Sequence, residues 1–365
     1  MSSVGNDNER LLESTGRGGQ KEEGFLAETG RDGYDDDIHG GDPYEAGGNV
    51  TSPSGNVVSP DISRRRRLVE ENLLRFLTPD VCRIPEKLRE AMEYSLTAGG
   101  KRIRPVVLLS AGGAVGGNEE DLLPFACALE YIHTYSLIHD DLPAMDDDDF
   151  RRGRPTCHKA FDDATAILAG DALLTEAFRV MGDSPLAARD PGKAMRATAL
   201  LARASGAEGM VGGQMMDLYP GPSTGRSSPQ DDLSGRPDAA ASEVEEIHLR
   251  KTAALLSASS GMGGILGGGD ESQVESLIRY GRALGLLFQV TDDILDETGS
   301  FEEMGKAVAK DRAREKLTVP AVYGMEAATK LAESLSRESI SALSAFGESA
   351  DTLRDIVRIV TTRRS

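Results

Sequence analysis

Residues 126–149 read ACALEYIHTYSLIHDDLPAMDDDD, and they join an apolar helix to a run of aspartates. The apolar part, Ala126–Ile138, is expected in the protein core, and Pro143 interrupts helical geometry just beyond it. Exposed aspartate runs are ordinarily solvated, but carboxylates at the end of a buried helix cost free energy unless a cation pairs with them. Because every donor here is an oxygen, the stretch predicts a Mg²⁺ site rather than a Zn²⁺ site.

A second aspartate cluster lies in residues 287–296, LFQVTDDILD. Asp292 and Asp296 are four residues apart, so on a helix they share one face, with about 5–6 Å between their Cβ atoms. These carboxylates repel each other unless a cation joins them. Mg²⁺ takes one or two carboxylates and completes its shell with water and phosphate oxygens. Two such helix faces in opposition would therefore hold a diphosphate between metal ions.

Basic residues complete the predicted site. The sequence GGKRIRP at residues 99–105 places cations after a glycine pair, which alone would be an ordinary charged turn between helices. If a helix begins there, Lys101 and Arg104 can converge on one anion, and Arg151 and Arg152 offer the same chemistry after the first cluster. Further donors occur later in the chain, and the last three of them would also be unremarkable on a surface: His248, Arg250, Lys251, Thr252, Lys306, Lys310 and Lys316.

The chain is predicted to be helical almost throughout from about residue 66, because apolar residues recur there with helical spacing. Several of these helices are apolar on more than one face, and such helices are usually buried among others. We therefore expect an all-α protein, a large bundle with central helices. After two apolar stripes within residues 66–96, the predicted helices span 121–142, 163–182, 192–208, 243–260, 272–297, 317–334 and 338–360.

Two segments have a composition that cannot bury enough apolar surface to offset the entropy of ordering. The first is an acidic, glycine-rich tail, residues 1–62, which is expected to be disordered. The folded domain is expected over residues 63–365. Within it, residues 219–242 combine four prolines with Gly, Ser and Asp, which indicates either a functional loop or a disordered insertion. The low complexity of this segment favours the insertion.

Composition excludes several classes of protein. The net charge of −19 argues against nucleic-acid binding, which depends on neutralising phosphates. Three cysteines without a CxxC spacing indicate a reducing compartment. No apolar stretch is long enough to span a membrane, and the N-terminal residues lack the pattern of a signal or transit peptide. We therefore expect a soluble, cytoplasmic protein without a nucleic-acid partner.

These motifs resemble those of the trans-polyprenyl diphosphate synthase family, the short-chain isoprenoid elongators, over about residues 66–365. Residues 99–105 resemble the family's GGKRxRP element, 137–156 its first Asp-rich motif in the DDxxxxD form, and 288–296 its second. LAGDALL, GGQ and Lys251-Thr252 match in the same order. The resemblance implies an isoprenoid-synthase-type helical bundle with a deep central cavity, usually assembled as a homodimer.

The resemblance also implies roles for single residues. Three Mg²⁺ ions per site would be held by Asp140, Asp141, Asp146, Asp292, Asp293 and Asp296. The allylic diphosphate would be held by Arg151, Lys251, Thr252, Gln289 and Lys306. Isopentenyl diphosphate would be held by Lys101, Arg104, His133 and Arg152, and Lys316 matches a later basic position. Catalysis would depend on Asp140, Asp141, Asp146, Arg151, Lys251, Asp292 and Asp293.

The implied reaction is ionisation of the allylic diphosphate, followed by attack of the isopentenyl double bond and removal of a proton by pyrophosphate. A dry cavity would protect the allylic cation, and Phe288 would stabilise it through its π face. Tyr135 and Ser136, five and four residues before Asp140, are expected to set product length. A bulky ring at Tyr135 resembles bacterial farnesyl diphosphate synthases and predicts a C15 product, with C20 geranylgeranyl diphosphate as the alternative.

Two other functions share part of this pattern. A class I terpene cyclase also ionises diphosphates with Asp-rich helices, but it needs no isopentenyl site such as Lys101 and Arg104. A noncatalytic regulatory subunit would be marked by the loss of an Asp cluster, and both clusters are intact here. The chain departs from the family's pattern at residues 161–163, at Ala309 and at Val319, and none of these departures touches the clusters.

Overall fold

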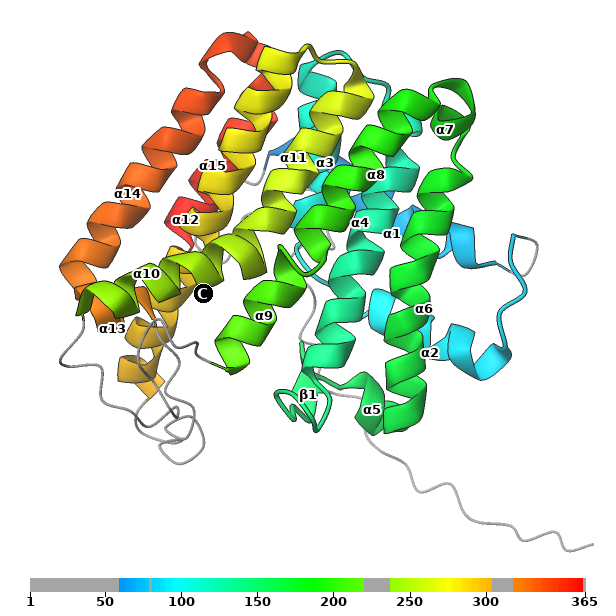
Figure 1. Ribbon diagram of the computed structural model, residues 1–365, viewed down its shortest axis with the longest axis horizontal. Helices are drawn as coiled ribbons and strands as arrows, with labels where there is room; N and C mark the ends of the chain where they lie inside the picture. The colour runs from blue at the N-terminus through cyan, green and yellow to red at the C-terminus, as the bar shows by residue number, and fades with distance from the viewer. Residues whose placement is uncertain (1–58, 79–80, 220–236, 304–317, 364–365) are drawn as a thin grey trace, which may run out of the picture. The chain divides into compact units, whose positions relative to one another are not determined.

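Helices account for nearly all of the described chain (Figure 1), as the apolar spacing predicted. The structure, a computed structural model, describes residues 59–78, 81–219, 237–303 and 318–363, all within the unit Pro43–Ser365. No helix in these ranges is both long and apolar enough to cross a membrane.

The helices in chain order are α1 (Pro60–Asn72), η1 (Arg75–Leu77), α2 (Glu86–Leu96), α3 (Ile103–Ala114), α4 (Glu119–Asp140), α5 (Cys157–Ala160), α6 (Asp163–Gly182), α7 (Pro185–Arg189), α8 (Pro191–Ser205), α9 (Met210–Leu218), α10 (Pro237–His248), η3 (Leu249–Ala253), α11 (Ala254–Gly267), α12 (Glu271–Glu303), α13 (Val319–Tyr323), α14 (Met325–Ala342), η5 (Ser344–Ala350) and α15 (Asp351–Thr362).

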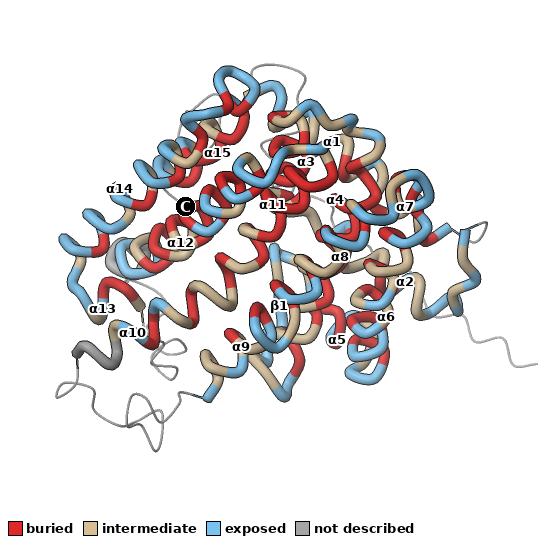
Figure 2. Tube along the Cα trace, turned by 45° about the horizontal axis from the view of Figure 1, so that its top comes forward, coloured by how far each residue is buried: buried red, intermediate tan, exposed pale blue. Residues whose placement is uncertain are grey.

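Helix α4 packs against α3, α6 and α11, and its residues are buried on almost every side (Figure 2). This burial follows from its sequence, since the helix has no broad polar face. Small residues let α3 and α11 approach each other closely. A Cβ atom on Gly263 would lie 2.8 Å from both the Ala111 side chain and the Gly112 nitrogen. The central helices are therefore close-packed around the segment that carries the first Asp cluster.

Local sequence sets both ends of α4. At its start, the Asn118 side chain accepts a hydrogen bond from the Glu120 N–H (3.0 Å), and acidic residues lie in the first turn, where the helix dipole favours negative charge. Beyond its end, Pro143 lies in a turn in which the Asp146 N–H donates to the Asp140 carbonyl oxygen (2.8 Å). The first Asp cluster therefore lies at a helix C-terminus, where carboxylates are electrostatically unfavourable.

The described residues contain one small sheet, a hairpin that follows the first Asp cluster. Strands β1 (Phe150–Arg151) and β2 (Arg154–Pro155) pair in antiparallel register. The two residues between them, Arg152 and Gly153, have φ angles of 53° and 75°. Positive φ at both central positions is the signature of the tight hairpin turns whose twist matches paired strands. The hairpin consequently presents Arg151 and Arg152 from adjacent positions.

Two predicted helices near the C-terminus are wrong in their bounds. The apolar spacing suggested helices over 317–334 and 338–360, but α13 ends before Gly324 and α14 then continues to Ala342. Gly324 has a φ of 81°, a conformation that ends a helix and that glycine adopts without steric cost. A second break occurs at Gly347, with a φ of 59°, before α15 begins. Apolar periodicity continued through both breaks and therefore did not reveal them.

The bounds of the predicted disordered segments also need correction. The tail assigned to residues 1–62 ends earlier, because α1 begins at Pro60. The insertion assigned to residues 219–242 ends earlier as well, because α10 begins at Pro237. Proline is favoured in the first turn of a helix, where its missing N–H is not needed. The remaining parts of both segments, 1–58 and 220–236, lie outside the described residues.

Candidate active site

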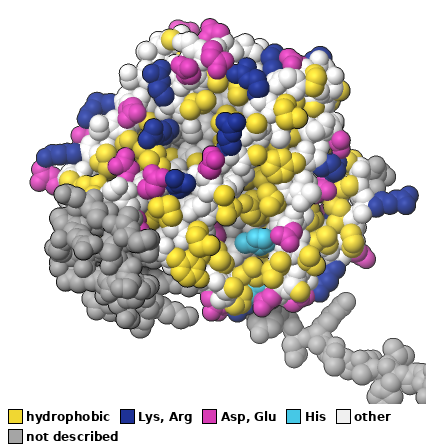
Figure 3. Space-filling view, viewed as in Figure 1, with side chains coloured by type: hydrophobic (Ala, Val, Ile, Leu, Met, Phe, Trp, Pro, Cys, Tyr) yellow, Lys and Arg dark blue, Asp and Glu magenta, His cyan; other side chains and the backbone are white. Residues whose placement is uncertain are grey.

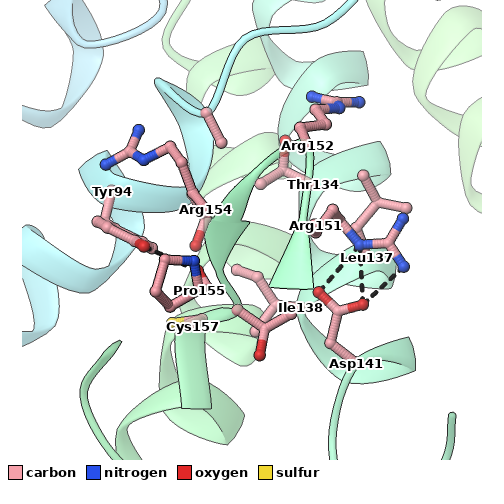
Figure 4. Close-up of a pocket in the computed structure, with 13 residues that line it drawn as sticks. Tyr94, Thr134, Leu137, Ile138, Asp141, Arg151, Arg152, Arg154, Pro155 and Cys157 are labelled. Carbon is pink, nitrogen blue, oxygen red and sulfur yellow. Dashed lines mark hydrogen bonds and ion pairs between the residues drawn. The ribbon is translucent and has the colours of Figure 1, made fainter. Parts of the chain in front are cut away.

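The first Asp cluster meets an arginine of the hairpin at the end of α4. Asp141 is buried, and the Nε atom of Arg151 lies 2.8 and 3.0 Å from its two carboxylate oxygens (Figure 4). A terminal nitrogen of Arg151 also lies 2.6 Å from Oδ1. Burial raises the pKa of Asp141, and the adjacent guanidinium opposes that rise. The planar fork of arginine suits a carboxylate, so Arg151 is held directly beside the cluster.

The Asp140 carboxylate is partly buried beside a second negative charge. Burial raises its pKa to about 6, Lys251 lowers it, and the negative charge of Asp146 raises it again. Within the described part of the chain, no side chain forms a hydrogen bond or ion pair with the Asp140 carboxylate. A half-buried carboxylate beside a second negative charge is a site that gains from a bound cation.

The glycine turn before α3 is tied to the hairpin. Gly99 and Gly100 have φ angles of 77° and 135°, so the turn depends on residues without a side chain. The Arg152 guanidinium donates a hydrogen bond to the Gly99 carbonyl oxygen. A Cβ atom on Gly100 would lie only 2.6 Å from a terminal nitrogen of Arg152. Because Gly100 has no side chain, the Arg152 guanidinium can lie against it. The glycine turn and the hairpin therefore form one cationic unit.

An ion pair that the sequence did not reveal fixes this turn from inside. Arg102 has a φ of 48° and points into the protein, where it lies 2.6 Å from the Glu130 carboxylate of α4 and donates to the Leu96 carbonyl oxygen. Both side chains are only 2–3% exposed. A carboxylate within an apolar helix was the available signal, because a buried charge requires a partner. This pair positions the residues on either side of Arg102.

Glu130→Gln is expected to lower the free energy of unfolding by about 3 kcal/mol, because it removes the nearer and buried counter-charge of Arg102 and leaves only Glu70, which is 3.6 Å away and partly exposed. Chemical denaturation of the purified variant measures this change. The matched control is Glu333→Gln on α14, since Glu333 is exposed and pairs with Arg337 at 3.8 Å. The control should change stability by less than about 0.5 kcal/mol. Equal effects of the two substitutions would contradict the assigned role of Glu130.

Lys101 and Arg104 were predicted to bind one anion, and the structure surrounds both with charged groups. A terminal nitrogen of Arg104 lies 3.2 Å from Nε2 of His133 on α4. Burial and the neighbouring Arg104 hold the pKa of His133 well below its usual range, so its imidazole is neutral and Nε2 can accept the hydrogen bond. Asp292 of α12 also acts electrostatically on Lys101 and Arg104. One cationic site therefore borders both α4 and α12.

Lys251 and Thr252 lie on a π-helical turn, Leu249–Ala253, between α10 and α11. The helix predicted over 243–260 is present, and it contains this π-helical turn. The Lys251 ammonium lies 2.6 Å from the Asp217 carboxylate of α9. Single π-helical turns are rare and are often found at functional sites, because they change the direction of side chains along a helix.

The π-helical turn connects to the second Asp cluster through a chain of hydrogen bonds. The Thr252 hydroxyl donates to the Gln289 side chain (3.0 Å), which in turn donates to Oδ1 of Asp293 (3.0 Å). Oδ2 of Asp293 accepts from the Val319 N–H (2.9 Å) and lies 3.6 Å from Nε2 of His248. Asp293 is therefore bonded within the protein through both oxygens and anchors α12 to α13. Its role as a metal ligand stays a prediction.

Asp292 points to a different neighbour, Arg363 near the C-terminus. The Arg363 guanidinium pairs with the Asp292 carboxylate and lies 4.3 Å from the centre of the Phe288 ring. No motif marked Arg363, which is 71 residues from Asp292 in sequence. The ring face assigned to stabilising an allylic cation is thus covered by a guanidinium in this structure.

The carboxylates present fit Mg²⁺ by their chemistry. Across the described ranges, no three acidic, histidine or cysteine side chains are grouped to hold a metal by themselves. Instead, each cluster offers separate carboxylates, half-buried at Asp140 and Asp292 and exposed at Asp296. Mg²⁺ takes one or two carboxylates and fills its shell with water and phosphate oxygens, so such clusters suit a metal that arrives with a diphosphate.

The other predicted site residues divide into two groups. Tyr135 is buried, with its ring edge-on to that of His139 at 5.8 Å between centroids. The Ser136 hydroxyl donates to the carbonyl oxygen of His133 (2.9 Å). The predicted diphosphate ligands Lys306 and Lys316, with Lys310, lie outside the described residues.

Known proteins share much of this amino-acid sequence. The chain matches the model of the family described as Polyprenyl synthetase over residues 85–358. It is 49% identical to the heterodimeric geranylgeranyl pyrophosphate synthase large subunit 1, chloroplastic, of Arabidopsis thaliana, over 72% of this chain and 68% of that protein. It is 47% identical to the geranylgeranyl pyrophosphate synthase, chloroplastic, of Capsicum annuum, over 72% of this chain and 67% of that protein.

Solved structures extend the similarity to the fold. An FPP/GFPP synthase from Zymomonas mobilis superposes with a TM-score of 0.68 at 35% identity, and the match covers 82% of this chain and 99% of that one. A geranyltransferase from Legionella pneumophila superposes with a TM-score of 0.67 at 33% identity, covering 82% of this chain and 95% of that one. The residues matched by the family model, 85–358, include both Asp clusters.

Proposed function

The chain belongs to the polyprenyl synthetase family and is a short-chain prenyl diphosphate synthase, and from this premise we propose that it condenses isopentenyl diphosphate with dimethylallyl or geranyl diphosphate to give farnesyl diphosphate (C15). The observation that carries the proposal is the charge arrangement around Arg104. This residue contacts His133 of α4 and interacts electrostatically with Asp292 of α12. A site for a second, anionic substrate thus borders both Asp-bearing helices.

The proposed mechanism assigns the two diphosphates to different cations. Arg151, Lys251, Thr252 and Gln289 hold the allylic diphosphate, while Lys101, Arg104, His133 and Arg152 hold isopentenyl diphosphate. Positive charge beside the departing pyrophosphate stabilises the negative charge that develops as the allylic C–O bond breaks. The isopentenyl double bond then attacks the allylic cation, and pyrophosphate takes the proton. Mg²⁺ would add charge neutralisation at the diphosphate, held by the carboxylates of Asp140, Asp141, Asp146, Asp292, Asp293 and Asp296.

Incubation of the full chain with Mg²⁺, labelled isopentenyl diphosphate and dimethylallyl diphosphate tests this function. Chromatography of the products should show a linear prenyl diphosphate that ends at C15. A cyclic hydrocarbon would assign the chain to the terpene cyclases. No product, in an assay in which a known synthase is active, would instead favour the regulatory subunit. Either result would overturn the proposed elongation.

The C15 product rests on Tyr135. Its side chain is only 6% exposed and lies in the hydrophobic cluster that includes residues of α4 and α6. Burial and the nearby charge of Asp140 raise the pKa of Tyr135 to about 12, so the ring remains a neutral, bulky group beneath the first cluster. A growing chain that starts at the Asp cluster would meet this ring.

A second candidate product is geranylgeranyl diphosphate (C20). The relatives from Arabidopsis thaliana and Capsicum annuum are both named as geranylgeranyl pyrophosphate synthases. The product assay separates the candidates directly, because a C20 synthase carries farnesyl diphosphate through one further condensation.

We also propose that the chain forms a homodimer through the face of α6, α8 and α9. Large apolar side chains are exposed there, and Figure 3 shows hydrophobic side chains gathered across this view of the molecule. Helix α6 carries Ile167 and Leu168 at 45% and 57% exposure, and Met195 of α8 and Met215 of α9 reach 68% and 60%. Apolar surface of this kind on a folded protein indicates an interface.

Replacing Leu168 and Met195 by Asp together is expected to convert a dimer into a monomer, because two charges would be buried in the interface without partners. Light scattering coupled to size exclusion measures the mass. Leu331→Asp is a matched control, since this leucine of α14 is 38% exposed on a different helix. A monomeric wild type, or a double variant that remains dimeric, would refute this interface.

The cellular compartment has two candidates. The cytosol is the compartment predicted from the sequence, whereas the relatives named above are chloroplastic. Imaging of the full chain fused at its C-terminus to a fluorescent protein distinguishes the cytosol from a plastid.

A further inference from the structure

The contact between Arg363 and the second Asp cluster has features that a simple surface ion pair lacks. Arg363 follows the last residue of α15, and its side chain is only 8% exposed. The guanidinium pairs with Oδ1 of Asp292 and lies against Phe288 at 4.3 Å from the ring centre. Burial against an aromatic face strengthens the attraction between the guanidinium and the carboxylate by removing water.

The contact is nevertheless incompletely bonded. The Nε atom of Arg363 is buried and has no hydrogen-bond partner among the described residues. Arginine carries five N–H donors, and buried donors are normally satisfied in a stable structural pair. The free energy of this contact therefore depends mainly on the Asp292 carboxylate and the Phe288 ring. A stronger ligand for the carboxylate can displace the guanidinium with little loss of other bonds.

The contact between Arg363 and Asp292 lies at the predicted metal site. The Asp292 side chain is 36% exposed and belongs to the cluster whose spacing predicts metal binding. Burial lowers the pKa of Lys101, and the Arg363 charge lowers it further while Asp292 opposes the decrease. The Asp292 carboxylate therefore pairs with Arg363 and also interacts electrostatically with Lys101.

We propose that Arg363 is an internal counter-cation that occupies the Asp292 carboxylate in the metal-free protein and competes with a divalent cation for it. The proposal rests on the proposed function only in treating Asp292 as a metal ligand. A carboxylate oxygen that accepts a hydrogen bond from a guanidinium has less negative charge available for Mg²⁺. A metal that binds through Oδ1 of Asp292 consequently requires the release of Arg363, and one that binds through Oδ2 lies beside the positive charge of the guanidinium. In both cases this arginine lowers the affinity of the second cluster.

The test is a titration of the full chain with Mn²⁺, followed by electron paramagnetic resonance, without any prenyl substrate. Arg363→Gln should tighten binding at the Asp292-dependent site by about three- to tenfold, equivalent to the loss of a modest competing interaction. Repeating the titration with inorganic pyrophosphate covers the case in which the metal binds with a diphosphate. Unchanged or weaker Mn²⁺ affinity under both conditions would overturn the proposal.

Two controls separate competition from a general loss of positive charge. Arg358→Gln removes a charge from α15, the helix that precedes Arg363, at a side chain that is 70% exposed and pairs with Asp355, and it should leave the affinity unchanged. In the Asp292→Asn background, Arg363→Gln should have no effect on Mn²⁺ binding. An equal effect of Arg358→Gln, or a persistent effect without Asp292, would contradict direct competition. Circular dichroism of each variant verifies that it is folded.

The metal titration is independent of turnover. If the chain failed to make any prenyl diphosphate, the proposed function would be refuted while the Mn²⁺ affinities still decided the role of Arg363. Conversely, an active enzyme with equal affinities in the wild type and Arg363→Gln would refute only the counter-cation.

Discussion

Replacing Asp140 by Asn is expected to lower the rate of prenyl transfer about a thousand-fold, the size of effect seen when one group that stabilises developing charge is removed. Asp140 lies at the end of α4 beside Asp146, and no described side chain is bonded to its carboxylate. Its charge is therefore available for a cation that neutralises the diphosphate. Asparagine keeps the shape of the side chain but removes that charge.

The same substitution should stabilise the metal-free protein above about pH 7. Burial raises the pKa of Asp140 from 3.8 to about 6, and this folded-state value lies above that of the unfolded chain. The carboxyl group therefore contributes stability below about pH 4, and this contribution is lost as the pH rises through about 6. At about pH 8 the ionised group opposes folding by on the order of 3 kcal/mol, which asparagine avoids.

Steady-state kinetics and thermal unfolding without metal measure the two effects. The control is Asp147→Asn in the same aspartate run, since Asp147 is exposed and its φ of 53° is a conformation that asparagine tolerates. This control should retain turnover and stability. If Asp140→Asn kept more than about a tenth of the activity, the α4 cluster would not have the role assigned to it, because loss of one such group costs a hundredfold or more. A lower melting temperature would contradict the charge argument.

The second large effect is expected in the product of Tyr135→Ala. Tyr135 precedes Asp140 by five residues, which places it about 7.5 Å further along the helix axis. Its ring is buried there, so its removal opens space beneath the first cluster. We expect the main product to shift from C15 to C20 or longer, because the chain can then extend past the former ring position. Chromatography of the dephosphorylated products gives the lengths.

Two further variants at Tyr135 separate an effect of ring size on product length from a loss of folding. Tyr135→Phe retains the ring and should retain the wild-type product. Removal of a buried aromatic side chain costs about 3–5 kcal/mol, so thermal unfolding must accompany the assay. Tyr135→Met keeps more of the volume and should still lengthen the product if the alanine variant does not fold. An unchanged product from a folded alanine or methionine variant would remove Tyr135 as the floor of the cavity.

Local patterns predicted much of the fold. Helix α6 has the predicted bounds, 163–182, because its apolar spacing, an aspartate cap and the end of its apolar run all lie within one segment. Gly324 shows where such patterns fail, since the apolar spacing continues through it while the backbone turns. A helix break set by one positive φ angle leaves little trace in hydrophobic periodicity.

The sequence by itself determined the all-helical class, the family and the residue types of the site. Each Asp cluster and the glycine turn consists of residues that are close together in the sequence, so each can be recognised without the fold. The tertiary structure alone decided the partner of each charge. Glu130 holds Arg102, Arg151 holds Asp141, and Arg363 occupies Asp292. These partners are 10 to 71 residues apart, so their meeting depends on how the whole bundle packs. The two aspartate clusters were evident in the chain, but which carboxylate remains open to a metal is a property of the folded protein.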